Sequence, residues 1–400
     1  IKTELSKLNP EKRLYAPRIP QGKTYRYKAP EFVNFHTDEL NKALRTIEEH
    51  EFELDGRGSI KLPEKLAKMK IRIGQTDYQL GIGGLHSCES QQVVTATEDT
   101  LIIDKDVASY YPAIILNLGL YPLHLGQSFL EIYKDIVDKR LEAKATGDKV
   151  VNESLKIVIN GSFGKLGSKW SALYSPDLMM QVTLTGQLSL LMLIEELQTW
   201  GLSVVSANTD GFVTMVNKDK LGEFQELCEA WESNTGFQLE ETRYKALYSR
   251  DVNNYLAILE DMSHKGKGIF AQSGLMKNPQ GEIIMDAVVD YLKYDTPLEH
   301  TIKTCDDVTK FLTVRTVAGG AVWRDDYLGK VVRWYYSTDG DSIHYKKNGN
   351  KVAKSDGAKP HMELGIFPKD IDYDVYVEEA LGVLADLGIK TEGEKKCQTN

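Results

Sequence analysis

The pattern of hydrophobic and polar positions along the chain predicts a mixture of helices and strands. Residues 178–200 form the longest strongly apolar stretch, and Gly201 follows it as a suitable C-terminal cap. The turn Thr146-Gly147-Asp148 separates two further helical stretches. Helices are therefore predicted for residues 37–52, 129–144, 152–161 and 178–200.

Short apolar runs bounded by turn residues predict strands between these helices. The clearest are residues 101–103, 202–207, 212–216 and 331–336. Asn208-Thr209-Asp210-Gly211 separates the second strand from the third and has the composition of a hairpin turn. Gly81-Ile82-Gly83-Gly84 predicts a tight loop. Helices and strands mixed in this way predict an α+β fold.

Length and composition change this picture only in part. A chain of 400 residues is expected to form two to four lobes. The net charge of -9 argues against a protein that coats nucleic acid over its whole surface. Basic residues nevertheless cluster, most clearly in residues 1–30, which are also rich in proline and predict an extended arm. A basic groove in an acidic body therefore remains compatible with the sequence.

The spacing of the cysteines and the length of the apolar stretches indicate the cellular environment of the protein. No stretch is expected to cross a bilayer, so no membrane partner is predicted. The four cysteines are scattered without a C-x-x-C pair and are expected to be reduced thiols: Cys88, Cys228, Cys305 and Cys397. A cytoplasmic location is expected.

Two aspartates are candidate metal ligands. Asp106 follows an apolar strand and precedes Ala-Ser-Tyr-Tyr-Pro112, so its carboxylate is expected at a sheet edge. A helix-capping role explains it equally well. Asp210 lies in the predicted hairpin turn, where Asn, Asp and Gly are also favoured for backbone reasons alone.

Two pairs of polar, mostly cationic residues form a third candidate. Arg140 with Lys144, and Lys156 with Asn160, are each spaced i, i+4 and so share a helical face. If the two helices fold back on each other, these groups can face a common anion; solvated helix faces are the alternative. Two aspartates and a basic helical pair are the minimal set for nucleotidyl transfer with two metal ions.

The three candidates occur in the order of the motifs of family B DNA polymerases. Asp106-Val-Ala-Ser-Tyr-Tyr-Pro112 resembles motif A, and Lys156-Ile-Val-Ile-Asn160-Gly-Ser-Phe-Gly164 resembles motif B. Ala207-Asn208-Thr-Asp210-Gly211 resembles motif C. The resemblance runs from about Tyr78 to Gly268. The compact chain and its Gly-Ile-Gly-Gly-Leu-His run are most similar to the bacteriophage type.

This resemblance implies a right-hand polymerase with an antiparallel palm sheet, short helical fingers and a C-terminal thumb. An N-terminal arm and template-side segment would come first. The implied boundaries are 1–100 for that segment, 101–127 and 171–262 for the palm, 128–170 for the fingers and 263–400 for the thumb.

The resemblance also implies roles for individual residues. Asp106 and Asp210 would be catalytic and would bind two Mg²⁺ ions, with the Val107 carbonyl as a further ligand and Mn²⁺ as a substitute metal. Tyr111 would exclude a 2′-hydroxyl from the incoming sugar. The implied nucleotide-binding residues are Tyr111, Arg140, Lys144, Lys156 and Asn160. The implied DNA-binding residues are Gly83, Gly84, Tyr255 and Lys267.

Five positions depart from the family pattern, and two of them, Gly161 and Phe163 in place of Ser and Tyr in motif B, are mild changes. Asn208 stands where motif C usually has its first aspartate, which removes one charge. Asn253 stands where a primer-gripping lysine is usual, and Lys245 or Arg250 is a candidate substitute. Gly81 stands where the template loop usually begins with tyrosine.

The resemblance implies primer- and template-dependent DNA synthesis from dNTPs. Primer–template DNA and replication proteins are the expected partners, and an exonuclease domain, if the native protein has one, is expected upstream of Ile1. One alternative is a catalytically silent polymerase-like scaffold that binds DNA, for which Asn208 and Asn253 are the motivation. Another is a different palm-type nucleotidyltransferase, such as a primase or reverse transcriptase.

Overall fold

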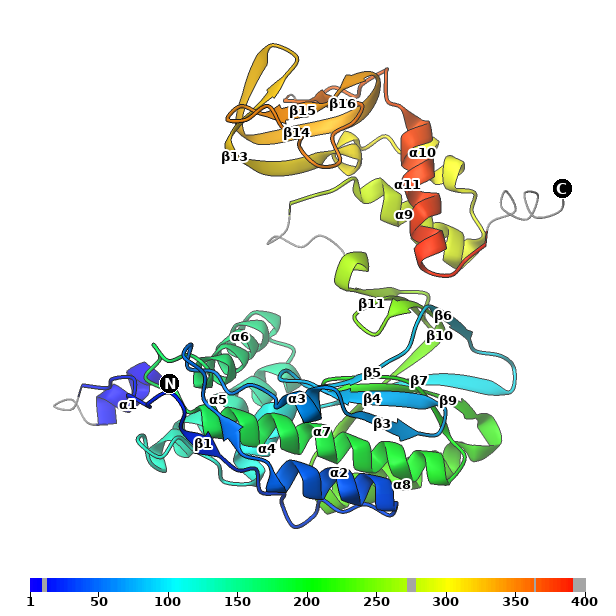
Figure 1. Cartoon of the computed structure of the whole chain (residues 1–400). Coiled ribbons are helices and arrows are strands. Elements are labelled where there is room, and N and C mark those ends of the chain that lie inside the picture. The colour runs from blue at the N-terminus through cyan, green and yellow to red at the C-terminus, as the bar shows by residue number, and fades with distance from the viewer. Residues whose placement is uncertain (9–12, 272–277, 363–364, 391–400) are drawn as a thin grey trace. The chain divides into compact units, whose positions relative to one another are not determined.

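The computed structural model describes residues 1–8, 13–271, 278–362 and 365–390 (Figure 1). The chain has a mixed α+β fold and divides into two compact units. The first comprises residues 1–89 and 96–243, and the second residues 90–95 and 244–400. Strand β10 (Leu239–Asp251) carries the chain from the first unit into the second.

The first unit contains a large sheet, a small two-stranded sheet and the helices α1 to α8. Its helices are α1 (Lys2–Leu8), α2 (Asp38–Glu49), α3 (Glu64–Ala67), α4 (Tyr110–Asn117), α5 (Ser128–Ala145), α6 (Lys149–Leu166), α7 (Pro176–Thr199), the 3-10 turn η1 (Lys218–Lys220) and α8 (Leu221–Thr235). Its strands are β1 (Thr24–Tyr25), β2 (Phe52–Glu53), β3 (Lys70–Ile73), β4 (Thr76–Leu80), β5 (Leu85–Ser87), β7 (Thr100–Val107), β8 (Ser203–Asn208) and β9 (Gly211–Asn217).

The sheet of the first unit is antiparallel and places the candidate site. Its strand order is β7-β9-β8-β5-β4-β3, and each of these neighbours pairs antiparallel. Strands β1 and β2 form a separate small pair. The strand predicted at residues 101–103 is longer than expected, because β7 continues through Asp106 to Val107.

Helix α7 is the core of the first unit and packs against β3, β5 and β8 (Figure 1). Gly201, with φ +71°, follows its end, as the sequence predicted. The helix begins two residues earlier than expected, with Pro176 in its first turn. Its apolar side chains are buried, so the helix joins the sheet to α4 and α8.

The expectation that no segment is long and apolar enough to cross a bilayer was wrong for α7. By length and composition it is a candidate span, with a mean hydropathy of 1.3 over its most apolar window. However, 83% of that window is buried inside the protein, as is usual for a core helix.

The N-terminal residues are more ordered than the predicted extended arm. Leu5 of α1 is buried, and Tyr27 is buried with its hydroxyl 3.0 Å from Thr185 Oγ1 of α7. The buried Glu195 carboxylate of α7 accepts hydrogen bonds from the backbone N–H groups of His36 and Thr37. Apolar contacts and capping of α2 therefore hold this segment on α7, which basic composition alone could not reveal.

The second unit combines two small sheets with helices. Its remaining strands are β6 (Gln92–Thr95), β11 (Asn254–Leu259), β12 (His264–Lys267), β13 (Thr313–Trp323), β14 (Asp326–Asp341), β15 (Ile343–Tyr345) and β16 (Ala358–Pro360). Its helices are α9 (Glu282–Tyr294), α10 (Leu298–Thr304) and α11 (Tyr373–Asp386), with 3-10 turns η2 (Gly268–Phe270) and η3 (Val308–Phe311).

In this unit β10 pairs with β11 and β6, and β15, β13, β14 and β16 form a four-stranded sheet. The predicted strand at 331–336 lies within β14, and its aromatic residues Trp334, Tyr335 and Tyr336 are buried. They belong to the hydrophobic cores of the second unit, so the aromatic side chains of this strand are packed.

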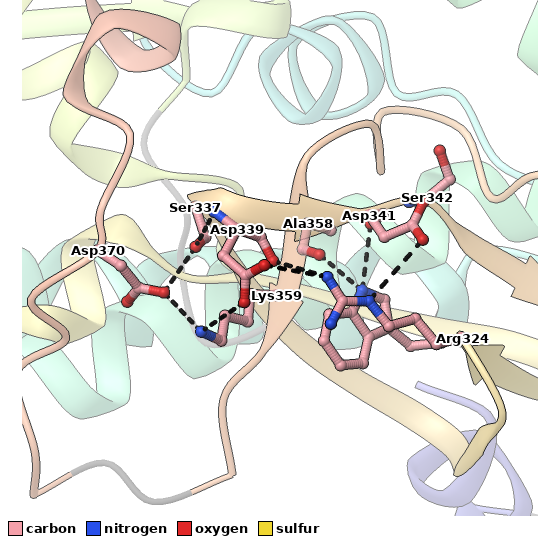
Figure 2. A network of polar contacts seen from close by, with 9 residues as sticks. Arg324, Ser337, Asp339, Asp341, Ser342, Ala358, Lys359 and Asp370 are labelled. Carbon is pink, nitrogen blue, oxygen red and sulfur yellow. Dashed lines mark hydrogen bonds and ion pairs between the residues drawn. The ribbon is translucent and has the colours of Figure 1, made fainter.

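A polar network joins the ends of β14 and β16 to the segment before α11 (Figure 2). Lys359 Nζ lies 2.5 Å from Asp370 Oδ2 and 3.5 Å from Asp339 Oδ2. Ser337 and Tyr335 also donate to the Asp370 carboxylate, each at 2.8 Å. Burial opposes ionisation of Asp370, but these donors lower its pKa to about 2.

Candidate functional site

The two candidate aspartates come together at one end of the sheet in the first unit. Strands β7 and β9 pair so that Asp106 lies opposite Gly211. The backbone N–H of Val107 donates to the Asp210 carbonyl at 2.7 Å, which ties the end of β7 to the β8–β9 turn. Asp106 is partly exposed and Asp210 is exposed, so both carboxylates lie where a ligand can reach them.

Gly211 is required here for a steric reason beyond turn formation. A Cβ at this position would lie 2.2 Å from Asp106 Oδ1 and 2.6 Å from the Lys105 carbonyl oxygen. No real side chain tolerates such distances, so only glycine lets the backbone of β9 pass beside the Asp106 carboxylate. Asp106 is therefore held against the turn that contains Asp210.

The glycine loop of residues 81–84 packs on this turn. Thr209 has φ +60°, and its N–H donates to the Leu85 carbonyl at 2.7 Å. A Cβ on Gly84 would lie 2.8 Å from Thr209 Cα. A Cβ on Gly81 would lie 2.7 Å from the Gly84 carbonyl oxygen, so the tyrosine usual in the family cannot occupy this backbone position without a shift.

Tyr111 links this loop to the helix α6. Its hydroxyl donates to the Gly83 carbonyl oxygen, and its ring stacks on Phe163 with centroids 4.4 Å apart. Burial raises the pKa of Tyr111, and the Asp210 charge raises it further. The effect of Asp210 on this hydroxyl is consistent with a single site that contains Tyr111 and Asp210.

The basic residues of α5 and α6 have different surroundings. Arg140 is partly buried and its Nη1 donates to Ser109 Oγ at 2.5 Å, next to Tyr110 and Tyr111. Lys144 forms an ion pair with Glu240 of β10. Lys156 and Asn160 are exposed on α6. Helices α5 and α6 pack together after the Thr146–Asp148 turn, as predicted, while a common anion for all four groups stays a prediction.

A second ion pair lies behind the site. Lys105 precedes Asp106 on β7 and is nearly buried, with its Nζ 3.0 Å from Glu241 Oε2. Burial opposes ionisation of Glu241, yet hydrogen bonds from Arg243 and Lys105 keep its pKa below the usual value. This pair anchors the end of β7 to the start of β10.

Two cavities flank the motif A segment and the loop. One of about 480 Å³ is lined by Ala108 and Ser109 together with residues of α4 and α5. The other, of about 240 Å³, is lined by Gly81 and Ile82 and by residues of α7. Both lie within the first unit.

The remaining predicted DNA-binding residues lie in the second unit. Tyr255 on β11 and Lys267 on β12 are opposite each other in the sheet, and Lys267 Nζ lies 5.8 Å from the centre of the Tyr255 ring. Gly268, with φ +66°, packs on the Asn253 carbonyl. Arg250, a candidate substitute for the missing lysine, instead forms an ion pair with Asp251.

The donor set at the turn suits a hard divalent cation, because Asp106, Asp210 and the Val107 carbonyl all offer oxygen. It is smaller than the usual acidic set. Among the described residues, no three His, Cys, Asp or Glu side chains gather in a metal-binding group. Asn208 Oδ1 accepts a hydrogen bond from Thr209 Oγ1 at 2.9 Å.

None of the three cysteines within the described residues forms part of this site. Cys88, Cys228 and Cys305 are free thiols, and burial raises the pKa of Cys228 to about 12. Cys397 lies outside the described residues.

Comparison with known proteins shows a distant similarity to a DNA polymerase. DNA polymerase 1 of Aeropyrum pernix is 28% identical over 246 residues, which are 58% of this chain and 24% of that protein. The matched segment therefore spans about a quarter of that relative. The solved structure of the family B DNA polymerase from the hyperthermophilic archaeon Pyrobaculum calidifontis has a TM-score of 0.47 and 13% identity, over 88% of this chain and 50% of that chain.

No family model matches the chain. The bacteriophage origin expected from the compact sequence has no support in these comparisons.

Sequence reasoning missed Gln187. This residue is buried in α7, where its amide makes two hydrogen bonds to Gly81. The available signal was a polar amide in the middle of the apolar stretch 178–200.

Proposed function

We propose that this chain contains the polymerising core of a family B DNA polymerase, which extends a primer 3′ end with dNTPs on a DNA template. The observation that carries the proposal is the convergence of Asp106, Asp210 and Tyr111 around one turn. The distant sequence similarity to a DNA polymerase supports it. Under this proposal, the palm, fingers and thumb follow the boundaries expected from the sequence.

The carboxylates of Asp106 and Asp210, with the Val107 carbonyl, would hold two Mg²⁺ ions, for which Mn²⁺ may be exchanged experimentally. When bound, such a pair of ions activates the attacking 3′-hydroxyl and stabilises the leaving pyrophosphate. The Val107–Asp210 backbone hydrogen bond and the close approach of Gly211 to Asp106 fix the backbone segments that carry both carboxylates. Rigid placement matters because the charge in the transition state is stabilised only by groups that are already in position.

The nucleotide would bind between the turn and the helices α5 and α6. Arg140 and Lys156 neutralise the triphosphate, with Lys144 in support. Asn160 lines the nucleotide site. The Tyr111 ring packs under the sugar, where it leaves no room for a 2′-hydroxyl.

DNA contacts would come from both units, and each is proposed separately. Gly83 and Gly84 bring bare backbone close to the template strand, because they lack side chains. Tyr255 and Lys267 offer a ring and a cation to the primer strand. Such backbone contacts suit an enzyme that must accept every sequence, and local basic positions suffice in a chain of net charge -9.

A catalytically silent DNA-binding scaffold is the second candidate. It is favoured by Asn208, which removes one carboxylate from the site, and by Asn253 in the primer-gripping position. A primase or reverse transcriptase is less well supported, since the Lys156–Gly164 segment resembles motif B of family B.

Extension of a labelled primer tests the proposal. The wild-type chain is incubated with dNTPs and Mg²⁺ or Mn²⁺ on four substrates: primed DNA, primed RNA, unprimed DNA and no template. Extension on primed DNA alone, abolished by EDTA, is expected. Binding of primer–template DNA without extension in either metal identifies the scaffold, and synthesis on RNA or without a primer identifies the other nucleotidyltransferases.

A further inference from the structure

Gln187 is a buried polar side chain in the apolar centre of α7. It is 1% exposed and is surrounded along the helix by buried leucines such as Leu184 and Leu188. An amide in such surroundings destabilises the fold unless its hydrogen bonds are satisfied. Its position therefore calls for partners, and the structure supplies them.

The Gln187 amide binds both polar groups of one backbone residue. The Gly81 N–H donates to Gln187 Oε1 at 2.9 Å, and Gln187 Nε2 donates to the Gly81 carbonyl at 2.9 Å. Nε2 also donates to the Thr183 carbonyl within α7 at 3.1 Å. Two bonds to one residue fix both its position and its orientation, as a paired strand would.

Gly81 begins the loop that contacts both parts of the candidate site. Two residues along, the Gly83 carbonyl accepts the Tyr111 hydroxyl. At the end of the loop, the Leu85 carbonyl accepts the Thr209 N–H beside Asp210. The contact between Gly81 and the Gly84 carbonyl leaves the loop little freedom between these points.

The hydrogen bond from the Tyr111 hydroxyl to the Gly83 carbonyl is the contact that keeps the ring from sliding within its own plane. The ring lies near those of Tyr110 and Phe163, with interplanar angles of 10° and 26°. Stacked rings can slide past one another at little cost, because the attraction is spread over many weak contacts. A directional hydrogen bond at the end of the ring opposes that sliding.

We infer that Gln187 is a positioning residue, which holds the loop of residues 81–85 so that the Gly83 carbonyl sets the place of Tyr111 and thereby the discrimination against ribonucleotides. This inference rests on the proposed role of Tyr111 at the sugar. Gln187 acts through the loop and touches no substrate. A glutamine suits this position because its amide accepts from the backbone N–H and donates to the backbone carbonyl of the same residue.

The test is the ratio of kcat/KM for a dNTP to that for the matching rNTP, measured on primed DNA with the full chain. Gln187→Leu removes both bonds and is expected to lower this ratio about tenfold, the effect of one lost hydrogen bond at Tyr111. Gln187→Glu keeps an acceptor for the Gly81 N–H and is expected to lower it by about threefold. Thr199→Ala is the control, because that hydroxyl lies at the C-terminal end of α7 and donates within the helix, to the Glu195 carbonyl.

A double-mutant cycle with Tyr111→Phe separates positioning from a general structural effect. If Gln187 acts through the Tyr111 hydroxyl, Gln187→Leu lowers the ratio no further in the Tyr111→Phe background. A ratio unchanged in both Gln187 variants, or effects that multiply in the double variant, would overturn the inference. If Gln187→Leu does not fold, Gln187→Glu provides the same comparison, with thermal unfolding as the check on folding.

Failure of the proposed function is recognised separately. Tyr111→Val removes the ring and is expected to raise rNTP incorporation strongly. If Tyr111→Val leaves the ratio unchanged, the sugar-excluding role of Tyr111 is wrong and the inference falls with it. If Tyr111→Val changes the ratio and the Gln187 variants do not, only the inference is wrong.

Discussion

Substituting Gly211 by alanine probes how closely the backbone of β9 passes the Asp106 carboxylate. The added Cβ would lie 2.2 Å from Asp106 Oδ1 and 2.6 Å from the Lys105 carbonyl oxygen. Ordinary contacts between such atoms begin near 3.5 Å, so the two strands or the carboxylate must move by about 1 Å. Strained packing of this kind costs about 1–3 kcal/mol of folding free energy.

The effect on catalysis is expected to be larger than the effect on stability. A reacting group displaced by about 1 Å loses on the order of 100-fold in rate. Gly211→Ala is therefore expected to reduce single-nucleotide incorporation about 100-fold and to lower the unfolding free energy by about 1–3 kcal/mol. The assays are rapid-quench primer extension and chemical denaturation of the same preparations.

Gly222→Ala is the matched control. It lies in the first turn of α8, and a Cβ there would meet no atom within 4 Å. Its stability and activity are expected to match the wild type or to rise slightly. Wild-type incorporation by Gly211→Ala at wild-type stability would refute the close approach of β9 to Asp106.

Three further predictions concern the nucleotide site, the second unit and the N-terminal segment. Arg140→Ala is expected to raise the KM for dNTP about tenfold, whereas Lys139→Ala, which removes a surface ion pair, leaves it unchanged; steady-state extension kinetics measure both. The pKa of the Asp370 carboxylate is about 2, against an ordinary 3.8. The charged carboxylate therefore stabilises the fold at pH values above 3.8, and this stabilisation is lost as the pH falls toward 2. Asp370→Asn is therefore expected to lower the free energy of unfolding by on the order of 1 kcal/mol at pH 7 and by little at pH 2. The control Asp325→Asn is expected to change the stability at neither pH, and acid denaturation followed by circular dichroism measures both variants. Glu195→Ala removes the acceptor for the backbone N–H groups of His36 and Thr37, which precede α2. It is expected to lower the free energy of unfolding by about 2 kcal/mol and to make the N-terminal segment more sensitive to limited proteolysis. An unchanged proteolysis rate would mean that these hydrogen bonds contribute nothing.

The main helices and the motif C hairpin could be predicted from the sequence because local signals set them. The apolar run of α7, Pro176 at its start and Gly201 after its end all lie within one stretch of chain. The turn at Asn208–Gly211 was likewise predicted from its composition, and β8 and β9 flank it. Such elements depend on neighbours in sequence, so a single sequence contains the information.

Long-range contacts could not be predicted in the same way. The bond between Gln187 and Gly81 joins residues 106 positions apart. A polar amide within an apolar stretch indicates that a partner exists, but the sequence does not identify Gly81 as that partner. The N-terminal segment was expected to be an unpacked arm because of its charge, yet Tyr27 meets Thr185 on α7. The steric role of Gly211 was hidden as well, since composition explains that glycine equally well as a turn residue.

The candidate site residues show the same difference between what local sequence predicts and what depends on long-range contacts. Asp106 and Asp210 lie in the first and third motifs of the resemblance, and the register of β7 and β9 brings the two segments together. The role of Lys144 depends on Glu240, a partner 96 residues away that the helical spacing could not supply. The residues of a nucleotide site come from several elements and depend on contacts between those elements. The i, i+4 spacing relates only residues on one helix.

The most direct test of the central claim is the rate of single-nucleotide incorporation by Asp210→Asn, compared with the wild type and with Asp219→Asn on primed DNA in Mg²⁺. Asp219 lies on the exposed turn η1 and serves as the matched loss of one carboxylate. The proposed polymerase predicts a rate at least about 100-fold below the wild type for Asp210→Asn and a wild-type rate for Asp219→Asn. Full incorporation by Asp210→Asn, or none by the wild type with DNA still bound, would contradict it.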